Sequence, residues 1–226
     1  MNLSKDLLLK FLRAVLFGEK LDASDFAEAD WKSIFQLADE QTVSALLLDG
    51  MSLLPSECIT IPLGDKLKRI ATMQRIEQIN CLHRKVIVKI DQALKSEGIP
   101  VVFMKGQMTA LRYPNPLHRT PGEIDFVVNP KDFKKTMEVL EKIGKVDLHL
   151  VHEHHGMAWV DGVTVEPHYK VHNYQCPSTD HAMQEMFTSV FPSELSSAGM
   201  DRYAVPVFPP TFESVFLISR GCVISL

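Results

Sequence analysis

The sequence lacks the features that mark secreted, membrane-spanning and nucleic-acid-binding proteins. The apolar start, MNLSKDLLLKFLRAVLF, is broken by charged residues at helical spacing, so we expect neither a signal peptide nor a membrane span there. No Lys/Arg cluster stands out and the formal net charge is −4, which makes nucleic acid an unlikely partner. No C-x-x-C pair occurs, which argues against a disulfide framework or a cysteine zinc site and fits reduced thiols in a cytoplasmic protein. The scattered cysteines are Cys58, Cys81, Cys176 and Cys222.

The overall composition is that of a folded protein. The chain has 226 residues, 46% of them hydrophobic and 23% charged, and shows no internal repeat or low-complexity segment. This length suits one large domain, or one domain with a helical extension.

Residues 1–98 carry helical patterns. Apolar residues recur at helical spacing near the N-terminus, after Asp30, and after Thr42, which we expect to cap a third helix. A long helix is predicted over residues 65–97, with Gly98 as its stop and Pro100 preventing continuation. These apolar stripes predict core packing.

After Gly98 the pattern alternates between strand and helix. A short helix is predicted over residues 106–113, a second from Asn129-Pro130 to Gly144, and a β-hairpin turn at Asp161-Gly162. The segment from 176 to 210 is mixed and punctuated by proline. The fold class expected is therefore α+β, with strands at residues 101–104, 123–128, roughly 147–152, 155–160 and 163–168.

Acidic residues recur at strand spacing in this second part. Glu123 and Asp125 are two apart, so strand periodicity places both carboxylates on one face. Glu166 and His168 share a face of a later strand in the same way. Carboxylates held together on a sheet suit a divalent cation, and three of them form the set used in two-metal phosphoryl or nucleotidyl transfer.

The order of these motifs resembles a known family. Strand–KG–helix–YP-x-P-x-x-R-x-x-x-E-I-D-F-V-V, followed by V-E-P-H, is similar to the uncharacterised nucleotidyltransferases of the DNA polymerase β superfamily, over about residues 99–170. The resemblance implies a polymerase β-type fold with a mixed sheet, a helical N-terminal region at 1–98, a nucleotidyltransferase-like domain at 99–210 and a helical C-terminal region beginning at 211–226. It also implies that Mg²⁺ or Mn²⁺ is bound by Glu123, Asp125 and Glu166.

The resemblance further implies a reaction and its binding residues. A nucleoside monophosphate would pass from a metal-bound NTP to an acceptor that the sequence does not identify, a small molecule being favoured. Gly106 would lie against the phosphates with Lys105 and Arg119 nearby, and His168 would orient Glu166 or act as a base. The sequence indicates no oligomeric state.

Other interpretations stay open. The family normally has Asp where this chain has Glu123, and relatives continue further at the C-terminus. A catalytically weak or inactive nucleotide-binding or interaction module is therefore the alternative function, and a metal-dependent phosphohydrolase is a third. Lys105 could pair with Asp125 instead of phosphate, and Arg119 could only neutralise the acids.

A histidine group also invites a metal hypothesis. It comprises His149, His152, His154 and His155. Strand alternation would put His152 and His154 on one face and His149 and His155 on the other, so we expect the four not to converge.

Overall fold

The protein has a mixed α+β fold, as the sequence predicts. A computed structural model describes residues 3–147, 154–171, 176–200 and 202–219. Contacts divide the chain into two compact units, Met1–Cys81 with Ala110–Pro121 and Leu82–Thr109 with Gly122–Leu226. The change of sequence pattern at Gly98 does not coincide with this division by contacts. Among the described residues, no helix has both the length and the apolar character needed to cross a membrane.

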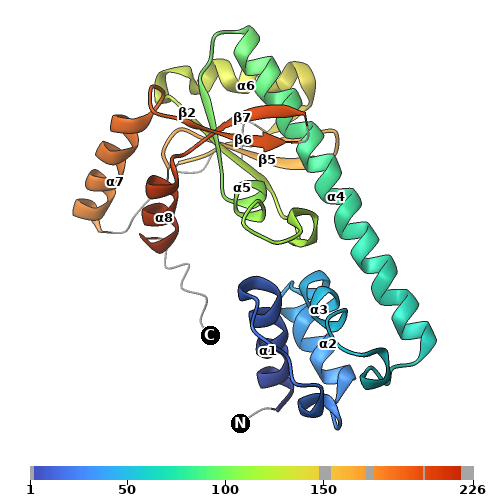
Figure 1. Cartoon of the computed structure of the whole chain (residues 1–226). Helices are drawn as coiled ribbons and strands as arrows, with labels where there is room; N and C mark the ends of the chain where they lie inside the picture. The colour runs from blue at the N-terminus through green and yellow to red at the C-terminus, as the bar shows by residue number, and fades with distance from the viewer. Residues whose placement is uncertain (1–2, 148–153, 172–175, 201, 220–226) are drawn as a thin grey trace. The chain divides into compact units, whose positions relative to one another are not determined.

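The first unit is helical. Its helices are α1 (Leu3–Phe17), α2 (Trp31–Glu40), α3 (Ser44–Met51) and the first part of α4 (Figure 1). The aromatic rings of Phe11, Phe26 and Trp31 meet in its core, with centroids 4.5 to 6.3 Å apart. Asp30 caps α2 by accepting a hydrogen bond from the Ser33 N–H. Short 3₁₀ turns lie at Ala23–Phe26, Ser56–Cys58 and Pro116–His118.

The predicted cap of α3 is wrong. Val43 is the N-cap residue and makes no side-chain capping bond. Thr42 lies one residue earlier with φ +57°, and its carbonyl accepts a hydrogen bond from the Thr120 hydroxyl. The connection between α2 and α3 is tight. Thr42 makes the turn there, because its backbone adopts a left-handed conformation.

Helix α4 runs from Leu63 to Ser96 and contributes to both units. Gly98, with φ +70°, ends it as predicted, and the Ile99 N–H bonds back to the Leu94 carbonyl. The expectation of core packing holds for its C-terminal part, where Val86, Ile90 and Leu94 are buried, but not for Leu67, Ile70 and Leu82, which are exposed.

One mixed sheet forms the centre of the second unit. In spatial order its strands are β3 (Lys145–Asp147), β4 (Met157–Val160), β5 (Val163–His168), β2 (Ile124–Val128), β1 (Val101–Met104), β7 (Tyr203–Val207) and β6 (Ser196–Met200). The strand β2 is antiparallel to β1 and parallel to β5. The Asp161-Gly162 turn joins β4 and β5 as an antiparallel hairpin, as predicted.

Helices cover the two faces of this sheet. One face carries Val102, Met104 and Val127 and packs against phenylalanines of α7 (Pro177–Val190) and α8 (Pro210–Ser219), which lie side by side (Figure 1). On the opposite face α6 (Phe133–Ile143) contacts β3, β4 and β5. A short helix, α5 (Gly106–Ala110), follows β1, and a 3₁₀ turn, Pro130–Asp132, leads into α6.

Several boundaries differ from the sequence predictions. The helix expected to reach residue 113 ends at Ala110, and the strand expected at 147–152 is observed as Lys145–Asp147, with residues 148–153 outside the described residues. The strands β6 and β7 were not predicted. Proline obscured them, since Pro206 stands inside β7, opposite Ser197 of β6.

Candidate active site

Two of the predicted acids meet on neighbouring strands. Because β2 and β5 are parallel and in register, Asp125 lies directly opposite Glu166. One ligand atom from each of Asp125, Glu166 and His168 lies within 4.8 Å of the others. Their side chains are 3%, 15% and 1% exposed respectively. The pair of carboxylates therefore opens to solvent through Glu166, while Asp125 is held in the interior.

Asp125 is surrounded by positive charge and hydrogen-bond donors. Its Oδ1 lies 2.6 Å from the Lys105 ammonium and 3.0 Å from His168 Nε2. Burial opposes the charged carboxylate, but the hydrogen bond from His168 and the charge of Lys105 outweigh it and lower the pKa of Asp125. The structure thus shows the ion pair that the sequence offered as one of two roles for Lys105.

His168 is a neutral imidazole at this position. Burial, together with the charges of Lys105 and His154, lowers the pKa of His168 to about 4 against the opposing effect of Asp125. Neutral imidazole carries one N–H, and the short contact with Asp125 places that proton on Nε2. Its Nδ1 is buried with no hydrogen-bond partner among the described residues.

Glu123 lies apart from this group. It is exposed and directly precedes β2, which begins at Ile124. Among the described residues, its carboxylate joins no cluster of ligand atoms within 4.8 Å. Strand periodicity from Asp125 does not extend to a residue outside the strand, and metal binding by Glu123 stays a prediction.

The turn after β1 needs a glycine. Lys105 and Gly106 have φ of +54° and +27°, and a β-carbon on Gly106 would stand 3.1 Å from the Glu123 carbonyl oxygen. This close approach ties the turn to the residue that leads into the acid strand. The predicted phosphate contacts of Lys105 and Gly106 are not tested by these distances.

Arg119 belongs to the helical unit. Its carbonyl accepts a hydrogen bond from the Asn80 amide at 2.9 Å, and its guanidinium reaches the Thr120 carbonyl at 3.4 Å. A role for Arg119 at the phosphates stays a prediction.

The histidines before β4 correct the sequence interpretation. His154 and His155 do not separate onto opposite faces: one ring nitrogen from each, together with one from His168, lies within 4.8 Å of the others. Both residues precede β4, which begins at Met157, so strand alternation does not apply to them. His149 and His152 lie outside the described residues. The signal available in the sequence was the adjacent H-H-G, since a glycine permits a bend.

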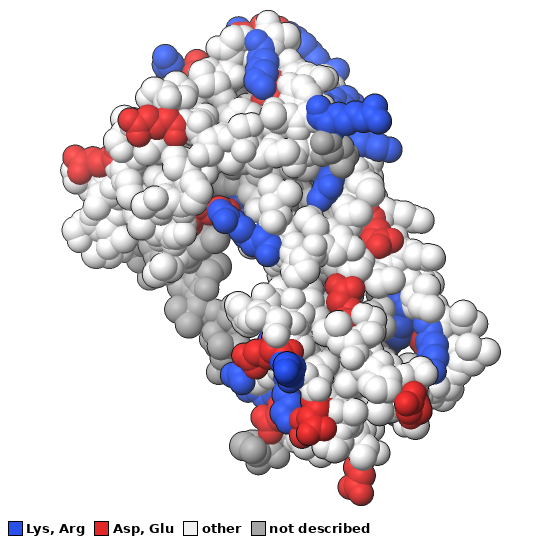
Figure 2. All heavy atoms as spheres, in the orientation of Figure 1, with Lys and Arg blue, Asp and Glu red and all other residues white. Residues whose placement is uncertain are grey.

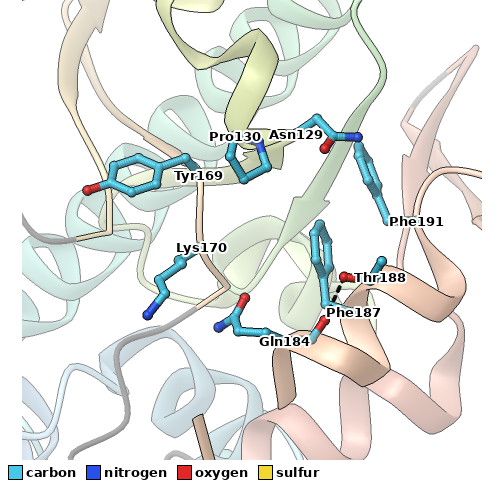
Figure 3. A pocket seen from close by; sticks show the side chains of 8 residues that line it. All are labelled: Asn129, Pro130, Tyr169, Lys170, Gln184, Phe187, Thr188 and Phe191. Carbon is cyan, nitrogen blue, oxygen red and sulfur yellow. Dashed lines mark hydrogen bonds between the residues drawn. The ribbon is translucent and has the colours of Figure 1, made fainter. Parts of the chain in front are cut away.

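A cavity of about 270 Å³ opens beside the ends of the acid strands. Its lining comes from the residues that follow β2, from those that follow β5, and from α7 (Figure 3). Tyr169 directly follows His168, and Lys170 is paired with Asp180 of α7 at 2.9 Å. The lining residues are Asn129, Pro130, Tyr169, Lys170, Gln184, Phe187, Thr188 and Phe191.

Comparisons with known proteins place the chain in one family. No functionally curated protein matches the chain. A crystal structure from Thermotoga maritima, described as a "putative nucleotidyltransferase", aligns with a TM-score of 0.41 and 15% identity, covering 62% of this chain and 84% of that one. The model of a family described as uncharacterised nucleotidyltransferases matches residues 27–222, which include both acid strands and the turn between β1 and α5. The chain belongs to this nucleotidyltransferase family.

Proposed function

We propose that this protein transfers a nucleoside monophosphate from an NTP to a small acceptor, in a cytoplasmic setting. The observation that carries the proposal is the placement of Asp125 opposite Glu166 on parallel strands, with their ligand atoms within 4.8 Å of His168. In this reaction an acceptor hydroxyl oxygen bonds to the α-phosphorus, the bond between the α-phosphorus and the β-phosphate oxygen breaks, pyrophosphate leaves, and the hydroxyl proton passes to solvent.

The acid pair suits a divalent cation. Carboxylate oxygens are the protein ligands that Mg²⁺ and Mn²⁺ prefer, and Mg²⁺ takes its remaining ligands from phosphate and water. Asp125 and Glu166 would hold the ion, with Glu123 as the further acid. When bound, the ion would neutralise the triphosphate and polarise the α-phosphate.

Lys105 and His168 prepare Asp125 for this role. In the structure the Lys105 ammonium supplies the positive charge beside Asp125 Oδ1. Cation binding would release Lys105 toward the phosphates, where it would act with the Gly106 backbone and Arg119. His168 would keep the Asp125 carboxylate in one orientation through Nε2.

The cavity beside α7 favours a small acceptor. Its volume of about 270 Å³ suits a molecule of the size of a sugar or an amino acid, and amide, hydroxyl and ammonium groups offer polar contacts within it. The net charge of −4 makes RNA the least favoured acceptor.

Pyrophosphate release tests the proposal. Purified protein with Mg²⁺ or Mn²⁺, mixed NTPs and a pool of metabolites should release pyrophosphate, and mass spectrometry should find a nucleotidylated product. Asp125→Asn should abolish release, because its amide replaces the shared carboxylate. Asp147→Asn, in β3, is the matched control and should leave the rate unchanged. A phosphohydrolase would instead release inorganic phosphate without a nucleotidylated product.

A second function is favoured by the same ion pair. Lys105 and His168 already satisfy Asp125 Oδ1, and Glu123 lies outside the cluster of ligand atoms, as expected for an inactive nucleotide-binding module. NTP binding by calorimetry, without pyrophosphate release under any of these conditions, would favour this alternative.

A further inference from the structure

Three histidine rings meet beside the acid pair, and the proposed transfer reaction gives no role to His154 and His155. The ring centroids of His154 and His155 are 4.5 Å apart. The ring centroid of His168 lies 5.4 Å from that of His154 and 5.0 Å from that of His155. One nitrogen from each ring lies within 4.8 Å of the others. Imidazole nitrogens so gathered are a ligand set for a transition metal, whereas Mg²⁺ prefers oxygen.

The backbone fixes the positions of these residues. The His154 carbonyl accepts a hydrogen bond from the Tyr169 N–H at 3.0 Å, and the Gly156 N–H donates to the Pro167 carbonyl at 2.9 Å. Between them His155 forms an antiparallel bridge with His168. The segment that carries two of the histidines is therefore held against the strand end that carries the third.

His168 supplies the independent observation. Its side chain is 1% exposed, its Nε2 contacts Asp125 Oδ1 at 3.0 Å, and its Nδ1 is buried with no hydrogen-bond partner among the described residues. A buried acceptor left without a donor is destabilising, so the free Nδ1 needs an explanation. Histidines that bind metal through one nitrogen commonly donate the other N–H to a carboxylate, and Asp125 provides that carboxylate here.

We propose that His154, His155 and His168 bind one Zn²⁺ ion, His168 through Nδ1, with solvent at the fourth position. Zn–N bonds of about 2.1 Å set nitrogens roughly 3.4 Å apart in a tetrahedral site, so the rings need to approach by about 1 Å. This site is distinct from the cation site at Asp125 and Glu166, and it does not rest on the proposed transfer reaction.

Cobalt titration tests the site, because tetrahedral Co²⁺ absorbs visible light and Zn²⁺ does not. The chain, stripped with EDTA and without nucleotide, should bind one equivalent of Co²⁺ with a visible band that Zn²⁺ abolishes. His154→Gln and His155→Gln should each weaken binding at least tenfold. His181→Gln is the matched control, since His181 is exposed on α7 beside Glu185, and it should change nothing. Calorimetry with Zn²⁺ should rank the affinities of the unaltered chain and of these variants in the same order as the Co²⁺ titration.

Glu166 separates this site from the acid pair, because its carboxylate lies 3.7 Å from His168 Nε2 and 3.9 Å from His155 Nε2. Glu166→Gln should retain Co²⁺ binding. Loss of binding in Glu166→Gln with retention in His154→Gln would assign the metal to the acids and overturn the proposal, as would the absence of a one-equivalent site in the unaltered chain.

A measurement on the unaltered chain guards against variants that fail to fold. In the cobalt protein each coordinated imidazole contributes one exchangeable, paramagnetically shifted N–H signal in the proton NMR spectrum. Three such signals are expected, and fewer than three would overturn the three-histidine assignment.

Discussion

Asp125 shows how a single buried carboxylate can be kept charged. Removal from water disfavours the ion, yet two donors converge on Oδ1 and one of them, Lys105, carries a full charge. Lys105 itself is only 17% exposed, so each partner stabilises the other in a partly desolvated place. Replacing Lys105 leaves Asp125 with the His168 hydrogen bond but no counter-charge, and replacing Asp125 removes the counter-charge of Lys105, so the effects of the two replacements should not add.

Glu123 can be tested without disturbing this pair. Because Glu123 is exposed and precedes β2, we expect Glu123→Ala to change the free energy of unfolding by less than about 0.5 kcal/mol. If Glu123 completes the cation site with nucleotide bound, the same variant should lower Mg²⁺-dependent turnover at least tenfold, measured by pyrophosphate release. Turnover equal to that of the parent would remove Glu123 from the metal ligands.

His118 gives the helical unit a pH-dependent stability. Its Nδ1 lies 2.7 Å from Asp49 and its Nε2 lies 3.0 Å from Glu77. Burial opposes protonation, but the two carboxylates outweigh it and raise the pKa of His118 above 6.5. A raised folded-state pKa means that this stabilisation is complete below pH 6.5 and is lost as pH rises through the folded value.

We therefore expect the free energy of unfolding of this unit to fall as pH rises above 6.5. Trp31 lies in the helical unit, so its fluorescence in a Trp159→Phe background follows that unit alone. Adding His118→Gln should remove most of the dependence. An equal slope in the presence and absence of His118 would assign the pH effect to other groups.

At the scale of elements, the turn from β1 into α5 combines a positive φ at Gly106 with a close approach to the chain before β2. Gly106→Ala places a methyl group 3.1 Å from the Glu123 carbonyl oxygen at φ +27°, so we expect a loss of about 1–3 kcal/mol in urea unfolding. Gly199→Ala is the control in the same unit, because a β-carbon there meets nothing within 4 Å. Equal effects of the two substitutions would contradict a close approach at Gly106.

Elements with strong local signals were predictable from the sequence. Helix α4 was found within two residues at each end, because its apolar spacing and Gly98 act locally. The parallel register of Asp125 and Glu166 depends on contacts between residues 41 positions apart (166 − 125), and the family motif predicted only that the two acids converge. The strands β6 and β7 had neither a local signal nor a family motif. Pro206 argues against a strand, and only the pairing of β7 with β1 and β6 explains why one forms there.

The candidate site shows the same division. Asp125, Glu166 and His168 were placed correctly together because each stands inside a strand, where alternation holds. His154 and His155 stand just before β4, and there alternation failed, whereas the role of Glu123, just before β2, stays a prediction. Burial of Asp125 accounts for its ion pair with Lys105, since a buried carboxylate needs a counter-charge, while the phosphate contact of Lys105 stays a prediction.

At the scale of the whole molecule, the net charge is small. Figure 2 shows acidic and basic side chains interspersed among uncharged ones on the face that it presents, in agreement with the small net charge of −4. The expectation that nucleic acid is not a partner rests on this net charge and stays a prediction. Recognition of a nucleotide would then depend on the local groups around Asp125 and on the bound cation.

The division into two units leads to the last prediction. Asp125, Glu166, Lys105 and His168 all lie in the second unit, together with Trp159, whereas Trp31 lies in the first. A ligand that binds only the folded state stabilises the part that it contacts, by RT ln(1 + [L]/Kd), about 2.7 kcal/mol at 100 times Kd. Two single-tryptophan variants report the two units separately: Trp31→Phe leaves Trp159, and Trp159→Phe leaves Trp31. Mg²⁺ with NTP should therefore raise the unfolding midpoint more in Trp31→Phe than in Trp159→Phe. Asp125→Asn should remove the difference. Equal shifts in the two backgrounds would mean that the units unfold together through α4, and a shift for Trp31 alone would place the nucleotide in the helical unit and refute the assignment of the site.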